Sequence, residues 1–148
     1  MPQSFDRFEV VRILGKGGMG TVYLARDARL DRLVAIKVLQ LSELVMDDRR
    51  ARFMREARTA ASVRHPNVAT IYEVGENEGV PFIVMEYCEG ETLAQRIRRR
   101  PLEPGEFLHI ARQLAAGVAA AHDGLRDKVD GISGLASVSR AMTRLQPA

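Results

Sequence analysis

A glycine-rich stretch near the start of the chain has the spacing of a phosphate-binding loop. Residues 15–20 fit the pattern G-x-G-x-x-G, in the order Gly15, Lys16, Gly17, Gly18, Met19 and Gly20. Glycine permits positive φ and lets backbone N–H groups approach phosphate oxygens without a Cβ in the way. The pattern alone has low specificity, because any glycine-rich hairpin turn matches it.

The residues after this stretch decide which kind of loop it is. A dinucleotide-binding loop is followed directly by a helix, whereas residues 22–24 here read Val-Tyr-Leu, which favours a strand. A P-loop requires G-K-[S/T], and that tripeptide does not occur in the sequence. The sequence therefore predicts a glycine-rich turn between two strands.

Lys37 lies within the apolar run Leu33–Leu39 and is a candidate ligand for a phosphate. In a strand, Lys37 shares a face with Ala35, while Val34, Ile36 and Val38 face the other way. The chain has only three lysines against nineteen arginines, and a lysine offers a compact cation on a flexible stem. The alternative is an edge-strand lysine whose ammonium group simply reaches solvent.

Glu56 is the candidate partner of Lys37. It follows Phe53 by three residues and precedes Ala60 by four, so its carboxylate points toward the apolar side of a predicted helix. A carboxylate on that side needs a cationic partner, and Lys37 is the natural one. The alternative is a surface pair with Arg52, one helical turn away, which contributes a few tenths of a kcal/mol.

The surrounding pattern predicts the elements that position these residues. Strand-like runs alternate early in the chain, and helical periodicity dominates later, where Thr92 is a plausible N-cap. We expect strands at residues 8–14, 21–26, 33–39, 68–74 and 80–87, and helices at 47–63, 92–100 and 104–122.

Composition sets broad limits on the class of protein. The 148 residues are enough for one ordinary domain, and no apolar run approaches the ~20 residues that span a bilayer. The net charge of +3 is mild, and the arginine run Arg96–Arg100 has no aromatic platform beside it, so we expect no nucleic-acid binding. A single cysteine, Cys88, fits a reducing cytoplasm, where we expect the protein to be located.

Five segments, in order and with matching gaps, resemble the small lobe of bacterial serine/threonine protein kinases of the eukaryotic type. They read LGKGGMGTVYLAR, VAIK, RFMREA, HPNV and FIVMEYCEGETL. The resemblance implies an α+β fold, with a five-stranded antiparallel sheet and one helix, followed by the first two helices of an incomplete large lobe. It further implies a small lobe with hinge at 5–89, the start of the helical lobe at 90–123 and an unmatched tail at 124–148.

The resemblance also implies roles toward ATP and Mg²⁺. The glycine-rich loop 15–20 would cover the phosphates, Lys37 would hold the α- and β-phosphates, and Glu56 would fix Lys37. The adenine ring would lie against Leu14, Val22 and Ala35, with Met85 behind it, the C=O of Glu86 and the N–H of Cys88 along its edge. Binding of Mg²⁺ would be weak, because the asparagine and aspartate that bind it in kinases have no counterparts here.

None of the aspartates that follow is a credible catalytic base. Eight residues after His122, where the resemblance places the base, stands Asp130, but His-Arg does not precede it and Leu135 takes the place of the asparagine. Asp127 follows an arginine yet comes three residues too early, and Asp123 belongs to the helix end. No D-F-G or A-P-E follows either.

Three interpretations stay open at this point. The chain is the ATP-binding part of a kinase whose sequence breaks off or shifts frame near Asp123, a non-catalytic nucleotide-binding or docking module, or a decayed gene fragment. The protein substrate or docking partner is unknown. The apolar stripe of the helix Pro104–His122 lacks expected partners, so we predict association through it.

Overall fold

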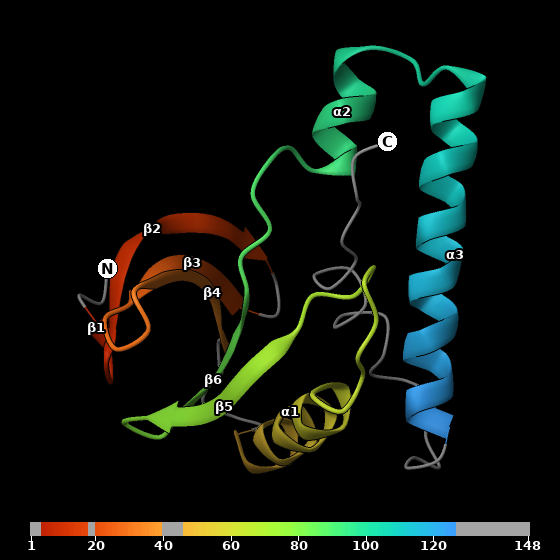
Figure 1. The fold of residues 1–148 in the computed structure, drawn as a ribbon. Coiled ribbons are helices and arrows are strands. Elements are labelled where there is room, and N and C mark those ends of the chain that lie inside the picture. Colours follow the sequence, from red (N-terminus) through yellow and green to blue (C-terminus); the bar gives the residue numbers. More distant parts are fainter. Residues whose placement is uncertain (1–3, 18–19, 40–45, 127–148) are drawn as a thin grey trace.

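The computed structural model describes residues 4–17, 20–39 and 46–126. Figure 1 shows a curled sheet with one helix against it and two further helices beyond it. The elements in chain order are β1 (Ser4–Phe5), β2 (Phe8–Gly17), β3 (Gly20–Asp27), β4 (Arg32–Leu39), α1 (Met46–Ala60), β5 (Ile71–Asn77), β6 (Val80–Glu86), α2 (Leu93–Arg99) and α3 (Pro104–Arg126).

Within the described residues the strands form one sheet in the order β1-β2-β3-β4-β6-β5, and every neighbouring pair is antiparallel. The five expected strands correspond to β2–β6, and the two-residue strand β1 is an addition to the expected five. β5 begins at Ile71 rather than at Val68, because the chain first turns: the N–H of Val68 donates to the C=O of His65 at 3.0 Å.

The two faces of the sheet bury separate apolar clusters, as the alternation of β4 predicts. Val34 and Ile36 are fully buried in one cluster, and Val38 packs against it. Ala35 faces the other way, into the cluster shared with α1. Lys37 has the same parity as Ala35, so β4 directs it to the face that α1 covers.

An ion pair joins two distant parts of the sheet. Arg7, in the turn between β1 and β2, donates to both carboxylate oxygens of Glu73 on β5, at 3.5 and 2.5 Å. Asp27 lies beside it, completely buried, and its Oδ1 accepts the backbone N–H groups of Arg29 and Leu30 at 3.1 and 3.3 Å. These contacts hold the β1–β2 turn against β5, at opposite ends of the strand order.

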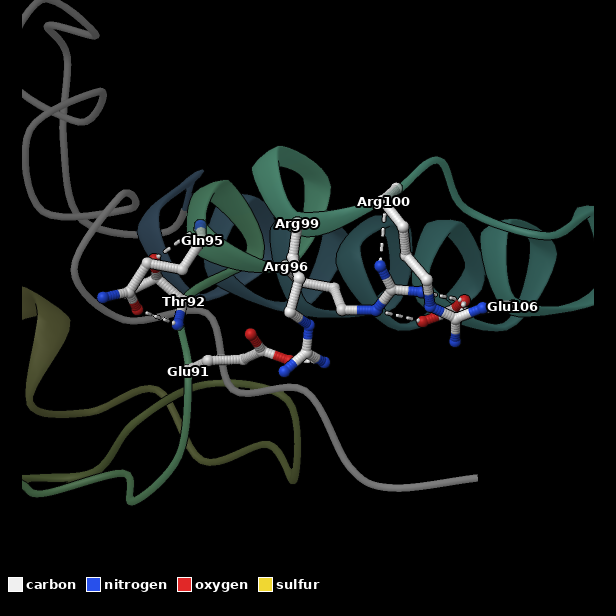
Figure 2. A network of polar contacts seen from close by, with 7 residues as sticks. All are labelled: Glu91, Thr92, Gln95, Arg96, Arg99, Arg100 and Glu106. Carbon is white, nitrogen blue, oxygen red and sulfur yellow. Dashed lines mark hydrogen bonds and ion pairs between the residues drawn. The ribbon is translucent and has the colours of Figure 1, made fainter.

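α2 and α3 are joined by a buried arginine, shown in Figure 2. Thr92 caps α2 as expected, in a capping box with Gln95. Arg96, 7% exposed, binds both carboxylate oxygens of Glu106 on α3, with Nε and Oε1 2.7 Å apart, and a third donor reaches the C=O of Arg100 at 3.0 Å. The Arg96 guanidinium holds the pKa of Glu106 below its ordinary value.

α3 is four residues longer than expected and leaves much of its apolar stripe in solvent. Phe107, Leu108 and Val118 are 56%, 54% and 51% exposed. The association expected through this helix stays a prediction. None of the helices in the described ranges is long and apolar enough to cross a membrane.

The far half of α3 packs on the turn between α1 and β5. The amide Nδ2 of Asn67 donates to Oε1 of Gln113 at 2.9 Å. A Cβ added at Gly117 would lie 2.9 Å from the backbone oxygen of Asn67, and one at Gly124 would lie 3.0 Å from Cγ2 of Val63. Because residues 117 and 124 of α3 are glycines, the helix can approach the segment after α1 this closely.

We expect Gly117→Ala to destabilise the protein, because the added methyl group meets a backbone oxygen that cannot rotate away. The cost of overpacking, about 1–3 kcal/mol, exceeds the gain of up to about 1 kcal/mol in helix propensity. Thermal unfolding of the variant measures it. Gly105→Ala, in the same helix with nothing within 4 Å of its added Cβ, is the control and should melt at the same or a higher temperature. Equal melting temperatures for both variants would contradict the close contact.

Candidate functional site

The glycine-rich stretch forms the connection between β2 and β3, as the sequence predicts. Lys16 pairs with Thr21 and Gly17 with Gly20, so the two strands stay paired up to the turn. Gly18 and Met19, at its tip, lie outside the described residues. Gly20 is buried and has φ 138°, a conformation that L side chains rarely adopt, so the backbone itself requires glycine there.

Gly15 and Gly17 have no such structural requirement. Both are exposed, neither has positive φ, and a Cβ added to either would meet nothing within 4 Å. Glycine costs conformational entropy in a strand, so its presence at two positions without a steric reason in the fold calls for another reason. Close approach of a ligand to the backbone is such a reason.

Apolar residues from four strands gather on the face of the sheet that α1 covers. Ala35 on β4 is directly opposite Met85 on β6, and both are buried. Leu14 and Val22, on the strands that carry the glycines, are partly buried and pack against the same cluster. The structure therefore brings together the four side chains that the kinase resemblance assigns to the adenine ring.

Lys37 lies between Val22 on β3 and Ile83 on β6, with its side chain half-buried. Burial lowers the pKa of the Lys37 ammonium, and the negative charge of Glu56 on α1 partly offsets this by raising it. Glu56 is partly buried, and within the described residues no direct ion pair joins it to Lys37. The two charges thus attract each other across a gap.

The last residue of β6 is joined to the residue before β5 by a contact that the sequence did not reveal. The backbone N–H of Glu86 donates to the C=O of Thr70 at 2.8 Å, and a Glu86 carboxylate oxygen accepts the N–H of Thr70 at 3.2 Å. Cys88, two residues further on, is exposed. Thr70 belongs to no motif, so only the structure makes its contact with Glu86 visible.

The candidate bases stay outside this site or outside the described residues. Asp123 is exposed near the end of α3, and Asp127, Asp130 and Leu135 are not described. In the parts of the chain that the structure describes, no group of three or more His, Cys, Asp or Glu side chains could hold a metal ion.

A curled antiparallel sheet, a helix carrying a carboxylate toward a strand lysine, and a glycine-rich strand–strand turn together define the small lobe of a protein kinase. The sequence matches the protein kinase domain family over residues 8–125, and the chain belongs to that family.

The relatives are bacterial serine/threonine-protein kinases. The chain is 45% identical over 117 residues to PrkC of Bacillus subtilis, covering 78% of this chain and 18% of PrkC. It is also 45% identical over 117 residues to pkn2 of Myxococcus xanthus, covering 79% of this chain and 14% of pkn2. The chain thus spans less than a fifth of these two relatives.

The same fold occurs in solved kinase domains. The crystal structure of the PknI kinase domain of Mycobacterium tuberculosis superposes with a TM-score of 0.67 at 35% sequence identity. The match covers 81% of this chain and 50% of the PknI chain. The chain therefore corresponds to about half of a kinase domain.

We expect Glu56→Gln to lower the pKa of Lys37 further, because the substitution removes the charge that raises it while burial stays. An NMR titration of isotopically labelled lysine measures this directly, since the chain has only three lysines to assign.

The pKa of Lys37 in the folded protein lies below the pKa of the same lysine in the unfolded chain, so the unfolded state binds more protons between the two values. Stability should accordingly rise with pH through that range. The control is Glu103→Gln, which removes an exposed carboxylate directly before α3 and should leave the Lys37 pKa unchanged. An unchanged Lys37 pKa in Glu56→Gln would refute the attraction between Lys37 and Glu56.

Proposed function

We propose that this chain is the ATP-binding part of a serine/threonine protein kinase. The observation that carries the proposal is the pair Gly15 and Gly17, where neither backbone conformation nor packing requires glycine. Backbone approach to phosphate oxygens explains both positions. The turn continues into strands that lead to the apolar cluster and lie beside Lys37, an arrangement that supports one ligand contacting all three features.

ATP fits the chemistry of these residues at both of its ends. The flat adenine ring would lie against Leu14, Val22 and Ala35, with Met85 behind it and the backbone of Glu86 and Cys88 along its edge. The phosphates would lie under residues 15–20, where the Lys37 ammonium supplies positive charge. Partial burial strengthens that interaction, because the ammonium group has less hydration to lose when a phosphate replaces water.

Glu56 would orient Lys37 in the bound state by closing the gap between them. Among the described residues, no cluster of three or more carboxylate, histidine or cysteine side chains could hold Mg²⁺. We therefore propose that Mg²⁺ enters with the phosphates and is held by few protein groups. In kinases the metal neutralises charge on the transferred phosphoryl group.

We further propose that the chain by itself does not transfer phosphate. Phosphoryl transfer depends on positioning and on electrostatic stabilisation of the transition state. The sequence contains no H-R-D, D-F-G or A-P-E segment, and in kinases these segments supply the catalytic base and the metal-binding groups. In this proposal residues 5–89 are the small lobe and hinge, and residues 90–123 begin the helical lobe. The single cysteine is consistent with a cytoplasmic location.

Calorimetric titration of the 148-residue chain with MgATP tests the binding. Gly17→Val should weaken binding at least tenfold, because its side chain enters open space where the phosphates would lie, and it should leave the melting temperature unchanged. Lys37→Met should also weaken binding, since it removes the ammonium group that we propose binds the phosphates. Gly105→Ala, remote from the site, is the control and should bind as the parent chain does.

Two results would overturn parts of this proposal. Binding of MgATP that is unaffected by Gly17→Val and Lys37→Met would place the nucleotide elsewhere. Transfer of labelled phosphate from ATP to a serine-rich protein substrate by this chain alone would refute the lack of catalysis. Absence of any binding would favour a decayed fragment over both a kinase part and a non-catalytic nucleotide-binding module.

A further inference from the structure

One side of α3 packs against the chain and the opposite side carries a row of apolar residues. Gln113, Gly117 and Gly124 lie on the packed side, against the segment after α1. Five residues on the opposite side follow one another at intervals of three and four residues, which keeps them on one helix face. We call them the outer row: Leu108, Ala111, Ala115, Val118 and His122.

The outer row differs from an ordinary solvated helix face. Leu108 and Val118 are 54% and 51% exposed, and Phe107 lies beside them at 56%. No other element in the described ranges carries more than one exposed large apolar side chain. The outer row contains no Asp, Glu, Lys or Arg, although such residues are usual on a helix face in water. A continuous apolar row without charges is typical of a surface that another element covers.

The end of the chain carries a second apolar series. Residues 127–148 include four large apolar residues at intervals of three, four and three: Leu135, Val138, Met142 and Leu145. This spacing favours a helix with these side chains on one face and polar residues such as Ser137 and Arg140 on the other. Ser133 is a favourable N-cap, and Pro147 cannot continue a helix.

The two series match each other in reverse order. The intervals from Leu135 to Leu145 equal those from Val118 back to Leu108. In an antiparallel arrangement four pairs would therefore lie level: Leu135 with Val118, Val138 with Ala115, Met142 with Ala111, and Leu145 with Leu108. The two alanines of the outer row would face longer side chains, which lets large and small residues interdigitate across the contact.

We propose that residues 133–146 form a helix that lies antiparallel along the outer row of α3. In this register Ser133 is level with Ala120, six residues before the end of α3 at Arg126. The connection 127–132 must then return about 9 Å along the helix and cross about 8–10 Å between the helix axes. The steps from Arg126 to Ser133 reach about 23 Å when extended, so the connection is long enough.

This segment fits the outer row better than a second copy of the chain does. Two outer rows packed antiparallel in the same way would place Ala111 opposite Ala115 at the centre of the contact. Two facing alanines bury less apolar surface than the same alanines under Val138 and Met142. The segment is also tethered to α3, so its pairing does not require a second molecule.

The test measures disulfide formation in the 148-residue chain, with Cys88 replaced by serine and two cysteines added. Leu108→Cys/Leu145→Cys links one end of the proposed pairing, and the exposed position of Leu108 makes the substitution safe for the fold. Under mild oxidation this pair should form an intrachain disulfide about tenfold faster than Leu108→Cys/Thr143→Cys, because a disulfide requires Cα atoms within about 7 Å. Thr143 is the matched control, since it lies close in sequence but off the apolar face of the proposed helix.

A charge on the apolar face should separate the two helices. Val138→Asp, added to the Leu108→Cys/Leu145→Cys protein, should reduce the disulfide rate to that of the Thr143 control, whereas Ser137→Asp, on the polar face, should leave it unchanged. Equal rates for the two cysteine pairs would overturn the proposal, because a tail without a fixed position favours neither. Disulfide-linked dimers in place of the intrachain product would also overturn it and would assign the outer row to a second copy.

Discussion

The Lys37 ammonium group, partly withdrawn from water, is the constraint to which the rest of this structure is fitted. β4 alternates between two apolar faces, and that alternation sends Lys37 to the side covered by α1. Burial disfavours the charged form, so the ammonium group depends on negative charge nearby. Glu56 supplies some of that charge from α1 without a direct ion pair. A bound phosphate group would supply the remaining negative charge. The charged form of Lys37 would then be more stable with the phosphate bound than without it.

Other features keep the surroundings of Lys37 in place. Arg7 and Glu73 join the two ends of the strand order, so the start of β2 is held to β5. Asn67 and Gly117 bring α3 close to the turn that follows α1. The helices beyond β6 are then joined by Arg96 and Glu106. Each of these contacts links segments from different parts of the chain. The candidate site likewise combines residues from four strands and a helix.

Local patterns predicted the parts of the fold that depend on near neighbours. The alternation in β4, the apolar side of α1 and the cap at Thr92 could all be inferred from spacing, and the structure confirms them. Contacts between distant residues could not be inferred. Arg7 lies 66 residues from Glu73. Asp27 is simply the polar last residue of β3, and Gly117 looks like any helical glycine until Asn67 is placed beside it. The site residues came from motifs in order, and whether they act together on ATP stays a prediction.

The most direct measurement is the pKa of Lys37, followed by NMR with and without saturating MgATP. If the phosphates bind beside the ammonium group, their negative charge favours its protonated form, and the pKa should rise when the nucleotide is added. Lys16 and Lys128 provide internal references in the same spectrum. A Lys37 pKa that stays the same at saturating MgATP would contradict the account, because the nucleotide would then lie away from the residue around which the site is built.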